Sequence, residues 1–447
     1  MPLFKIIIAF CNYAFSFAEQ LHFNKKSAKL KLSHLSETLI ASEIVSLGGE
    51  IREKIRQGEK IYNFTVGDFD PKIFPIPKAL EDEIIDAYRN HFTNYPAAEG
   101  NLDLRESISI FLKQRQNLDY SSKEILVSCG GRPLIYSLFR SIVDADDKVV
   151  YAVPSWNNNH YTHFNGGKHV IIETHVENNF MPTAEDIAPY IKDAVLICLC
   201  SPQNPTGTTI TKKDLESICD MVLEENKNRS GEEKKLYMMY DQMYWNLTYG
   251  NTVHYDPVSL RPEMKNYTVY IDAISKVFAA TGLRVGWSFG PAEILDKMKS
   301  ILGHIGAWAP MAEQKATAKF LLQKENIDEF LKKFKSDVEV RLHAIYDQFI
   351  KLKKEGFNVD AVVPQAAIYL TIKIDLAGKK ASNGKLLSTQ SDVTAYILNE
   401  AKLAVVPFSA FGANKNSPWY RLSVGTCHLK DIPEMVEKLK SAMQQLS

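Results

Sequence analysis

The chain has 447 residues and a hydrophobic content of 45%, which is ordinary for a soluble globular protein with room for two or three domains. Lysine plus arginine and aspartate plus glutamate both number 53, so no overall basic field exists to hold nucleic acid or an anionic membrane. We therefore expect neither as a partner. The six cysteines lack the doubled spacing of metal ligands, so we expect no metal site and interpret them as free thiols of a reducing compartment.

The first 18 residues, MPLFKIIIAFCNYAFSFA, have the pattern of a secretory signal, because Lys5 precedes a short apolar run that ends in small residues. The run is too short to span a bilayer. The alternative is that residues 1–35 are a non-functional or mis-assigned extension. The rest of the sequence is typical of a cytosolic protein, and we predict a cytoplasmic location.

Short apolar runs alternate with amphipathic stretches between about residues 124 and 289. This rhythm predicts an α/β fold with a mostly parallel central sheet covered by helices. In such sheets ligands bind at the carboxyl ends of the strands, so the residues just after each run are the candidates for a site. The expected strands are ILVS (125–128), KVVYAV (148–153), HVIIE (169–173), AVLICLC (194–200), LYMMYD (236–241), TVYID (268–272) and RVGWSF (284–289).

A long helical pattern follows over residues 310–356. The sequence after it, from FNVDAVVPQAAIYLTIKID onward, mixes strands and helices around a polar loop. This part predicts a second, smaller α+β domain.

A glycine turn and an aromatic residue follow the first two of these strands. In CGGRP, Gly130 and Gly131 let a ligand approach the backbone, and a helix that begins near Arg132 would offer free N–H groups to an anion. A simple tight turn is the alternative. In PSW, Trp156 offers an aromatic face, although core packing explains a lone tryptophan equally well.

Polar residues also follow the later strands. Asn204 stands between two prolines in SPQNPTGT, which fix its backbone. Asp241 ends a run of five apolar residues and is followed by Tyr244, so its carboxylate is expected to be desolvated and to need a cation or a protonated nitrogen. An ordinary helix N-cap is the alternative for Asp241.

The stretch IDAISKVFAATGLRVGW places Lys276 next to Ser275 at the end of an apolar run, with Arg284 between two glycines. Burying either cation is costly without a partner, so something anionic or covalent is expected there. An aromatic, anionic cofactor that carries an aldehyde would use every group at these strand ends.

This set of residues resembles the pyridoxal-phosphate enzymes of fold type I, and specifically the class I/II aminotransferases of the bacterial aspartate aminotransferase type. The resemblance runs from about Ser36 to the C-terminus, and SKVFAATGLRVGW is its most specific motif. It implies that Lys276 holds pyridoxal 5'-phosphate as a Schiff base, that Arg284 binds the phosphate and that Asp241 pairs with the pyridine nitrogen. The other implied cofactor contacts are Asn204 and Tyr244 with the ring oxygen, Trp156 stacked on the ring, and Gly130, Gly131, Arg132 and Ser275 around the phosphate.

Further motifs extend the resemblance. Tyr95 in NYPAAEGNLDLR would reach the phosphate of a neighbouring subunit, which implies a homodimer with shared sites. Arg421 in YRLSVGT would bind the substrate α-carboxylate. The implied substrate-binding residues are Gly67 of NFTVGDFDP, Arg132, Trp156, Asn204 and Arg421. The implied domains are an N-terminal arm and small-domain part (36–75), a large cofactor-binding domain (76–310) and a C-terminal small domain (311–447).

The sequence departs from the family pattern at two places. Ala273 stands where many relatives carry a phosphate-binding serine, which leaves the role of Ser275 open. Arg132 stands where some bacterial aspartate aminotransferases carry a lysine that binds the substrate side chain, and an arginine would serve as a bidentate carboxylate ligand. A surface position or an extra phosphate contact are the alternatives for Arg132.

We therefore expect an aminotransferase that moves an amino group from an amino acid, preferably aspartate, to a 2-oxo acid such as 2-oxoglutarate. Other enzymes of the same fold, such as a carbon–sulfur lyase or a decarboxylase, would keep the same cofactor residues, and an aminotransferase for aromatic or neutral amino acids is a further alternative. A non-catalytic cofactor-binding regulator and a structural α/β protein belong to other classes, but no DNA-binding helix pair or basic patch is appended to the chain.

Overall fold

The computed structural model describes residues 31–39 and 43–447, so the signal-like segment and most of the expected extension lie outside the described residues. The chain divides into two compact units, residues 1–40 and 41–447. In the first unit, helix α2 (His34–Thr38) is capped by the Ser33 hydroxyl, which accepts a hydrogen bond from the Ser36 amide. The second unit contains all the other elements described below.

The centre of the second unit is a seven-stranded sheet in the order β2-β8-β7-β6-β5-β3-β4. Neighbouring strands from β4 to β7 run parallel, whereas β8 is antiparallel to both β7 and β2. The predicted α/β fold with a mostly parallel sheet is therefore confirmed. The strands are β2 (Ile125–Ser128), β3 (Lys148–Val153), β4 (Lys168–Glu173), β5 (Ala194–Cys200), β6 (Tyr237–Asp241), β7 (Thr268–Ala273) and β8 (Gly286–Phe289).

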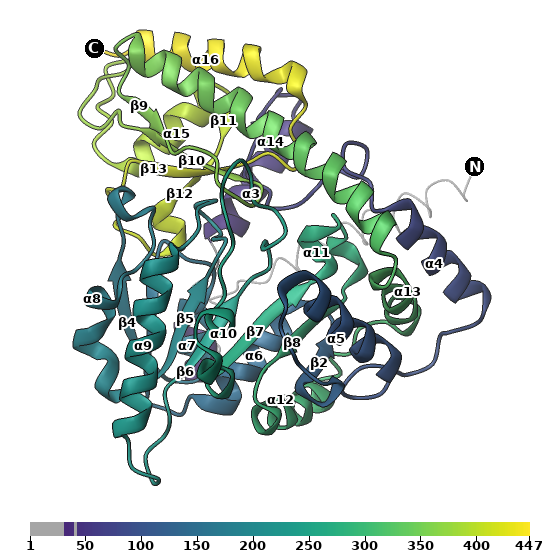
Figure 1. Cartoon of the computed structure of the whole chain (residues 1–447). Coiled ribbons are helices and arrows are strands. Elements are labelled where there is room, and N and C mark those ends of the chain that lie inside the picture. Colours follow the sequence, from purple (N-terminus) through teal and green to yellow (C-terminus); the bar gives the residue numbers. More distant parts are fainter. Residues whose placement is uncertain (1–30, 40–42) are drawn as a thin grey trace, which may run out of the picture. The chain divides into compact units, whose positions relative to one another are not determined.

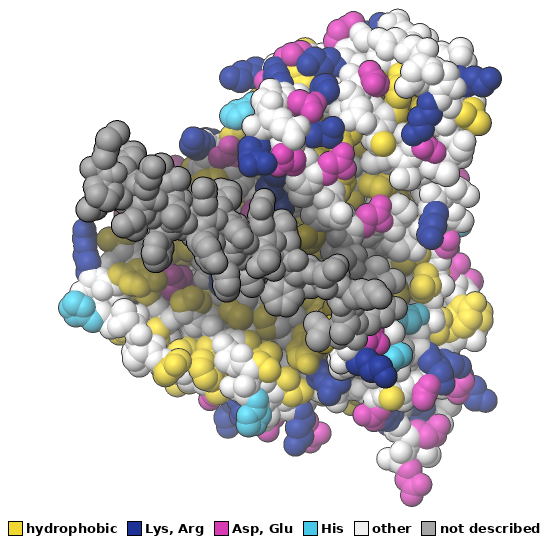
Figure 2. Space-filling view, turned by 180° about the vertical axis from the view of Figure 1, so that it is seen from behind, with side chains coloured by type: hydrophobic (Ala, Val, Ile, Leu, Met, Phe, Trp, Pro, Cys, Tyr) yellow, Lys and Arg dark blue, Asp and Glu magenta, His cyan; other side chains and the backbone are white. Residues whose placement is uncertain are grey.

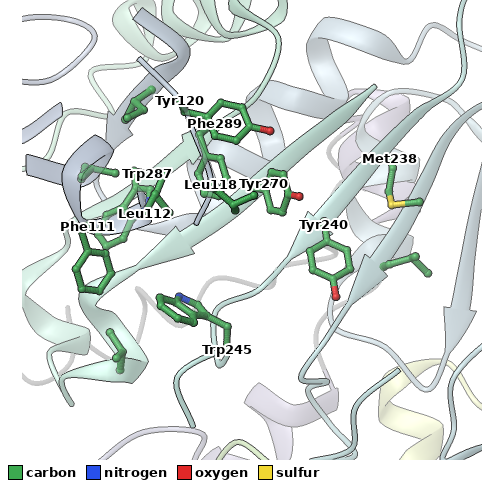
Figure 3. Close-up of a cluster of buried hydrophobic side chains, with 14 of the residues drawn as sticks. Phe111, Leu112, Leu118, Tyr120, Met238, Tyr240, Trp245, Tyr270, Trp287 and Phe289 are labelled. Carbon is green, nitrogen blue, oxygen red and sulfur yellow. The ribbon is translucent and has the colours of Figure 1, made fainter. Parts of the chain in front are cut away.

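Helices pack on this sheet because successive strand side chains point to opposite faces. On β7, Tyr270 belongs to one apolar cluster, whereas Val269 and Ile271 belong to another. Figure 3 shows the first cluster, in which the rings of Tyr270 and Phe289 are stacked with centroids 4.3 Å apart. The helices of this region are α4 (Lys78–Arg89), α5 (Leu102–Gln116), α6 (Gly131–Ile142), α7 (Asn158–Phe164), α8 (Ala184–Ile187), α9 (Lys212–Asn228), α10 (Pro257–Leu260), α11 (Ile274–Val277), α12 (Ala292–His304) and α13 (Met311–Leu321).

The C-terminal part is built on an antiparallel sheet in the order β12-β13-β10-β9. Strand β1 (Tyr62–Asn63) pairs in parallel with β11 (Leu403–Ala404), so the segment after α3 (Glu43–Arg56) joins this C-terminal part. Figure 1 shows these elements grouped around the upper end of α14. They are α14 (Lys324–Lys354), β9 (Val359–Ala361), β10 (Tyr369–Ile374), α15 (Gln390–Glu400), β12 (Val406–Pro407), β13 (Trp419–Ser423) and α16 (Ile432–Gln444).

The helical pattern over residues 310–356 forms two helices, α13 and α14, rather than one. Gln323 has a ψ of 73°, far from the helical value near −42°, so the chain leaves the helix there. The apolar period continues across this break, which is why the sequence pattern alone does not reveal it.

The charged surface and the cysteines agree with an ordinary globular protein. On the face shown in Figure 2, lysine and arginine side chains lie interspersed with aspartate and glutamate. None of the helices in residues 31–39 and 43–447 combines the length and apolar character needed to cross a membrane. The five cysteines within the described residues are free thiols.

Candidate active site

A pocket of about 450 Å³ lies where the seven-stranded sheet presents the carboxyl ends of its strands and where β10 and β13 approach it. Of the residues that the sequence singles out, the structure brings eleven to the wall of this pocket. They are Gly67, Gly131, Arg132, Trp156, Asn204, Asp241, Tyr244, Ser275, Lys276, Arg284 and Arg421.

Lys276 lies on α11, the short helix that directly follows β7, and its Nζ donates a hydrogen bond to the carbonyl oxygen of Gly67 at 2.5 Å. Burial lowers the pKa of this amine to about 8, against an ordinary value of 10.5. The negative charge of Asp68 opposes this effect of burial on the pKa, whereas the positive charges of Arg421, Arg132 and Arg284 contribute to the lowering. The neutral, nucleophilic fraction of Lys276 near neutral pH is therefore much larger than that of an ordinary lysine.

Asp241 is the last residue of β6, and burial raises the pKa of its carboxyl to about 6. Its Oδ1 accepts a hydrogen bond from the Met243 amide at 3.0 Å, which closes a short turn, and no helix begins at this position. The helix N-cap alternative is therefore wrong. A desolvated carboxylate at the pocket wall favours a bound cation or a protonated nitrogen.

The glycine turn after β2 leads directly into α6, whose first residue is Gly131. Gly130 has a φ of 93°, and a Cβ there would lie 2.3 Å from Nη2 of Arg284. Arg284 itself has a left-handed φ of 57°, and its guanidinium donates to the carbonyl oxygens of Thr281 at 2.7 Å and Cys129 at 2.9 Å. The turn thus places a guanidinium beside the N-terminus of α6, which is an arrangement that binds anions.

Arg421 comes from β13 and is buried, yet its guanidinium hydrogen-bonds only to neutral oxygens among the described residues. Its Nη1 donates to Oδ1 of Asn204 at 3.0 Å, and its Nη2 donates to the carbonyl oxygen of Thr65 at 2.6 Å. A buried guanidinium without a carboxylate partner is expected to receive an anionic ligand.

Arg132 and Trp156 form a contact of their own. The Arg132 guanidinium carbon lies 5.2 Å from the centre of the Trp156 ring, which is within cation–π range. Arg132 is exposed, and no ion pair or hydrogen bond holds it to another described residue. Trp156 also packs on Phe411, so it is half-buried at the pocket wall and partly serves the core.

Three of the residues discussed from the sequence lie elsewhere. Tyr95 is 82% exposed, outside the pocket, and packs edge-on against Trp308 with ring centroids 5.3 Å apart. Ala273 is buried at the end of β7. Gly130 does not line the pocket, and it lies against the guanidinium of Arg284.

Sequence reasoning missed other residues at the pocket wall. Tyr369, the first residue of β10, lies within hydrogen-bond distance of Tyr244. Helix α3 contributes Ile44, Gly48 and Arg52, whose spacing of four residues places them on one helix face. That spacing was a usable signal, whereas a tyrosine in an apolar strand gave none. Within the described residues, no group of three or more metal-ligating side chains could hold an ion.

The chain was compared with known proteins. Residues 59–439 match the family model described as aminotransferase class I and II. The aspartate aminotransferase of Bacillus sp. (strain YM-2) is 29% identical over 411 residues, which cover 91% of this chain and 98% of that protein. The aspartate aminotransferase of Geobacillus stearothermophilus is also 29% identical, over 93% of this chain and 99% of that protein.

Solved structures agree with this result. The aspartate aminotransferase of Rhizobium meliloti superposes with a TM-score of 0.84 at 26% identity and covers 93% of this chain and 100% of that one. That of Thermus thermophilus with maleate gives a TM-score of 0.81 at 25% identity, over 92% of this chain and 99% of that one. The chain therefore belongs to the class I and II aminotransferases and is a transaminase of fold type I.

Proposed function

We propose that the protein uses pyridoxal 5'-phosphate to transfer the amino group of an acidic amino acid, aspartate first, to a 2-oxo acid such as 2-oxoglutarate. The observation that carries this proposal is the amine of Lys276, whose pKa is lowered to about 8, in one pocket with the carboxylate of Asp241 and the buried guanidinium of Arg421.

The groups around the pocket fit this cofactor in their chemistry. Lys276 would hold its aldehyde, and Asp241 would face its pyridine nitrogen. Arg284, Ser275 and the first amides of α6 would bind its phosphate, since the missing Cβ of Gly130 lets the Arg284 guanidinium lie against the turn that begins α6. Trp156 would cover its ring, while Asn204 and Tyr244 would bind its ring oxygen.

The bound cofactor supplies an electron sink for the charge that forms at the substrate α-carbon. Asp241 would keep a proton on the ring nitrogen, because an ionised carboxylate stabilises a protonated neighbour. Arg421 fixes the α-carboxylate and thereby orients the Cα–H bond. Lys276 would act as the general base that takes the α-proton and gives it back, and its lowered pKa raises the neutral fraction that can do so.

The charges at the pocket wall support an acidic substrate. Among the described residues, the pocket is lined by one acidic side chain, Asp241, and by the cationic residues Arg52, Arg132, Lys276, Arg284 and Arg421. With Arg284 on the phosphate, Arg421 on the α-carboxylate and Lys276 at the aldehyde, Arg132 and Arg52 remain for a second carboxylate. The relatives named aspartate aminotransferase, one of them solved with the dicarboxylate maleate, support the same choice.

A neutral or aromatic donor is the second candidate. Ile44, Ile135 and Met243 also line the pocket and would contact an apolar side chain. A carbon–sulfur lyase or a decarboxylase would use the same cofactor residues. Neither reaction requires Arg132 and Arg52 to bind a second carboxylate, so these two arginines do not favour them over transamination.

The experiment that tests the function is an absorbance scan of the purified holoenzyme before and after aspartate is added, without any keto acid. We expect the band of the lysine-bound cofactor to disappear and the pyridoxamine form to grow. Lys276→Ala should show neither the initial band nor turnover, while its circular dichroism stays native. If the wild-type band persists with aspartate but is lost with a neutral amino acid, the amino donor is a neutral amino acid and not aspartate. A protein that gains no cofactor band after incubation with pyridoxal phosphate would overturn the proposal.

We also propose the arm (36–75), large domain (76–310) and small domain (311–447) as the working division of the chain. Two apolar clusters support the arm and the separation of two cores. One joins residues between Leu80 and Leu331, so it extends past residue 311 through α13 into the start of α14, and the other joins Tyr62, Phe64, Phe69 and Phe74 with residues of the C-terminal part. A homodimer with Tyr95 in the partner's site is part of the same proposal, and a cytoplasmic location stays a prediction from sequence.

A further inference from the structure

Tyr369 is a buried residue of the pocket wall that the mechanism above does not use. We propose that Tyr369 is a positioning residue. Its hydroxyl donates a hydrogen bond to the Tyr244 oxygen and so directs the Tyr244 hydroxyl toward the ring oxygen of the cofactor. The inference rests on the proposed function, because it assumes the cofactor and the role of Tyr244.

The geometry of the two phenols is closely defined. The oxygens of Tyr244 and Tyr369 lie 2.6 Å apart, and their ring centroids are 5.5 Å apart at an interplanar angle of 70°. Tyr244 follows β6 of the large sheet, whereas Tyr369 begins β10 of the smaller sheet. The pair is therefore a direct hydrogen bond between the two halves of the pocket.

Tyr369 is held on several sides. The guanidinium carbon of Arg421 lies 4.8 Å from the centre of its ring, and a Cβ on Gly67 would lie 2.8 Å from its hydroxyl. Its backbone carbonyl lies 2.2 Å from where a Cβ on Gly207 would be, and the Thr371 hydroxyl donates to the carbonyl oxygen of Thr206 at 2.8 Å. These contacts fix the Tyr369 backbone and ring, and therefore its hydroxyl oxygen, relative to the loop that carries Asn204.

The number of protons determines the direction of the bond. Burial raises the pKa of both phenols, so each keeps its one hydroxyl proton at neutral pH. A hydroxyl has one donor and two acceptor sites. If Tyr244 donates to the ring oxygen of the cofactor, its proton is used there, and the hydrogen bond between the tyrosines must be donated by Tyr369.

This direction has an electronic consequence. A hydroxyl that accepts a hydrogen bond becomes a stronger donor, because bonds in a chain polarise one another. A stronger Tyr244 donor withdraws more charge from the ring oxygen and so stabilises the protonated Schiff base at Lys276 less. Tyr369 therefore lowers the pKa of that nitrogen, and its removal raises it.

The test is an absorbance titration with pH of the substrate-free holoenzyme, which reports this pKa without turnover. We expect Tyr369→Phe to raise the pKa by about 0.4–1 pH unit, the equivalent of one ordinary hydrogen bond. Tyr244→Phe should raise it more, and the double variant should equal Tyr244→Phe, because Tyr369 acts only through Tyr244.

Tyr249→Phe is the matched control. Tyr249 is also a buried tyrosine of the same apolar cluster, but its hydroxyl donates to the carbonyl oxygen of Ala367 and it does not line this pocket. It should lose a comparable hydrogen bond and leave the pKa unchanged.

The outcomes separate the inference from the function. A wild-type protein without a cofactor band overturns the proposed function. A wild-type band with an unchanged pKa in Tyr369→Phe, or an additive double variant, overturns the role of Tyr369 alone. If Tyr369→Phe does not fold, 3-fluorotyrosine at position 369 decides the question, because its more acidic phenol should lower the pKa, and an unchanged or raised value refutes the inference.

Discussion

Arg132 and Arg421 show how differently two arginines of one pocket are held. Arg421 is buried, with hydrogen bonds at 3.0 and 2.6 Å that fix its plane. Arg132 is exposed and contacts the Trp156 ring, with no oxygen bound to its guanidinium among the described residues. The first is suited to the α-carboxylate that all amino acids share, and the second to a group that differs between substrates.

We predict that Arg132→Gln raises the KM for aspartate about 10- to 100-fold, the cost of losing one hydrogen-bonded charge pair, with little change for an apolar amino acid. Steady-state kinetics with both substrates measures this. Arg140→Gln is the control, because Arg140 is on the same helix and bonds to Asn165 outside the pocket. Equal increases for both substrates would assign Arg132 to the cofactor instead.

The sequence predicted the positions of residues whose chemistry is unusual for their place. A lysine, an aspartate or an arginine at the end of an apolar run is conspicuous, and Lys276, Asp241 and Arg284 do reach one pocket. Arg421, which lines the same pocket, was expected only from the family resemblance. Tyr369 was not predictable, because a tyrosine in an apolar strand is equally typical of a core. The roles of all these residues stay predictions until variants are measured.

At the scale of elements, the apolar runs predicted all seven strands of the large sheet, but not the direction of β8. Antiparallel strands often alternate apolar and polar residues, whereas parallel strands are buried on both faces. Because β8 is buried along its whole length like its parallel neighbours, its reversal left no trace in the sequence. Its expected start at Arg284 was two residues early, because Arg284 has a left-handed φ of 57° that a strand does not allow. The functional motif around Arg284 thus overrides the strand pattern.

The loop after β5 packs against the start of β10. Gly207 is where the backbone of this loop comes closest to the backbone of β10. Its φ is 71°, and an added Cβ would lie 2.2 Å from the carbonyl oxygen of Tyr369, which is backbone and has little freedom to move. We predict that Gly207→Ala destabilises the protein by about 2–5 kcal/mol, from backbone strain plus overpacking. Thermal unfolding of the holoenzyme measures the loss.

Gly250→Ala separates these two causes. Gly250 also has a positive φ, 54°, but a Cβ there would meet no atom within 4 Å. Backbone strain alone should cost about 1–2 kcal/mol. If both variants lose the same stability, the contact between the loop and β10 contributes nothing.

At the scale of the whole molecule, the expected dimer determines which chain completes which site. Tyr95 is 82% exposed and lies outside the pocket of its own chain, as a residue that serves a neighbouring site would. The exposed tyrosine and its edge contact with Trp308 are ordinary surface features by themselves. Only a mixing experiment tests their role.

We predict that Lys276→Ala and Tyr95→Phe chains, unfolded and refolded together, regain activity above that of Tyr95→Phe alone. In a mixed dimer, one site has both native residues, Lys276 from one chain and Tyr95 from the other. The control places both changes in one chain and mixes it with Tyr95→Phe, which restores no native site. Activity that does not rise in the first mixture contradicts shared sites.

Helix α14 has 31 residues and a length of about 46 Å. Its first turns, at Ile327 and Leu331, belong to the apolar cluster of the large sheet, and from Phe334 to Leu352 it belongs to the cluster of the smaller sheet. Figure 1 shows it running from beside α13 to beside α16. Since one continuous helix is part of both cores, neither core can unfold on its own without fraying part of this helix. Any rotation of the smaller sheet relative to the larger one must also move or bend it.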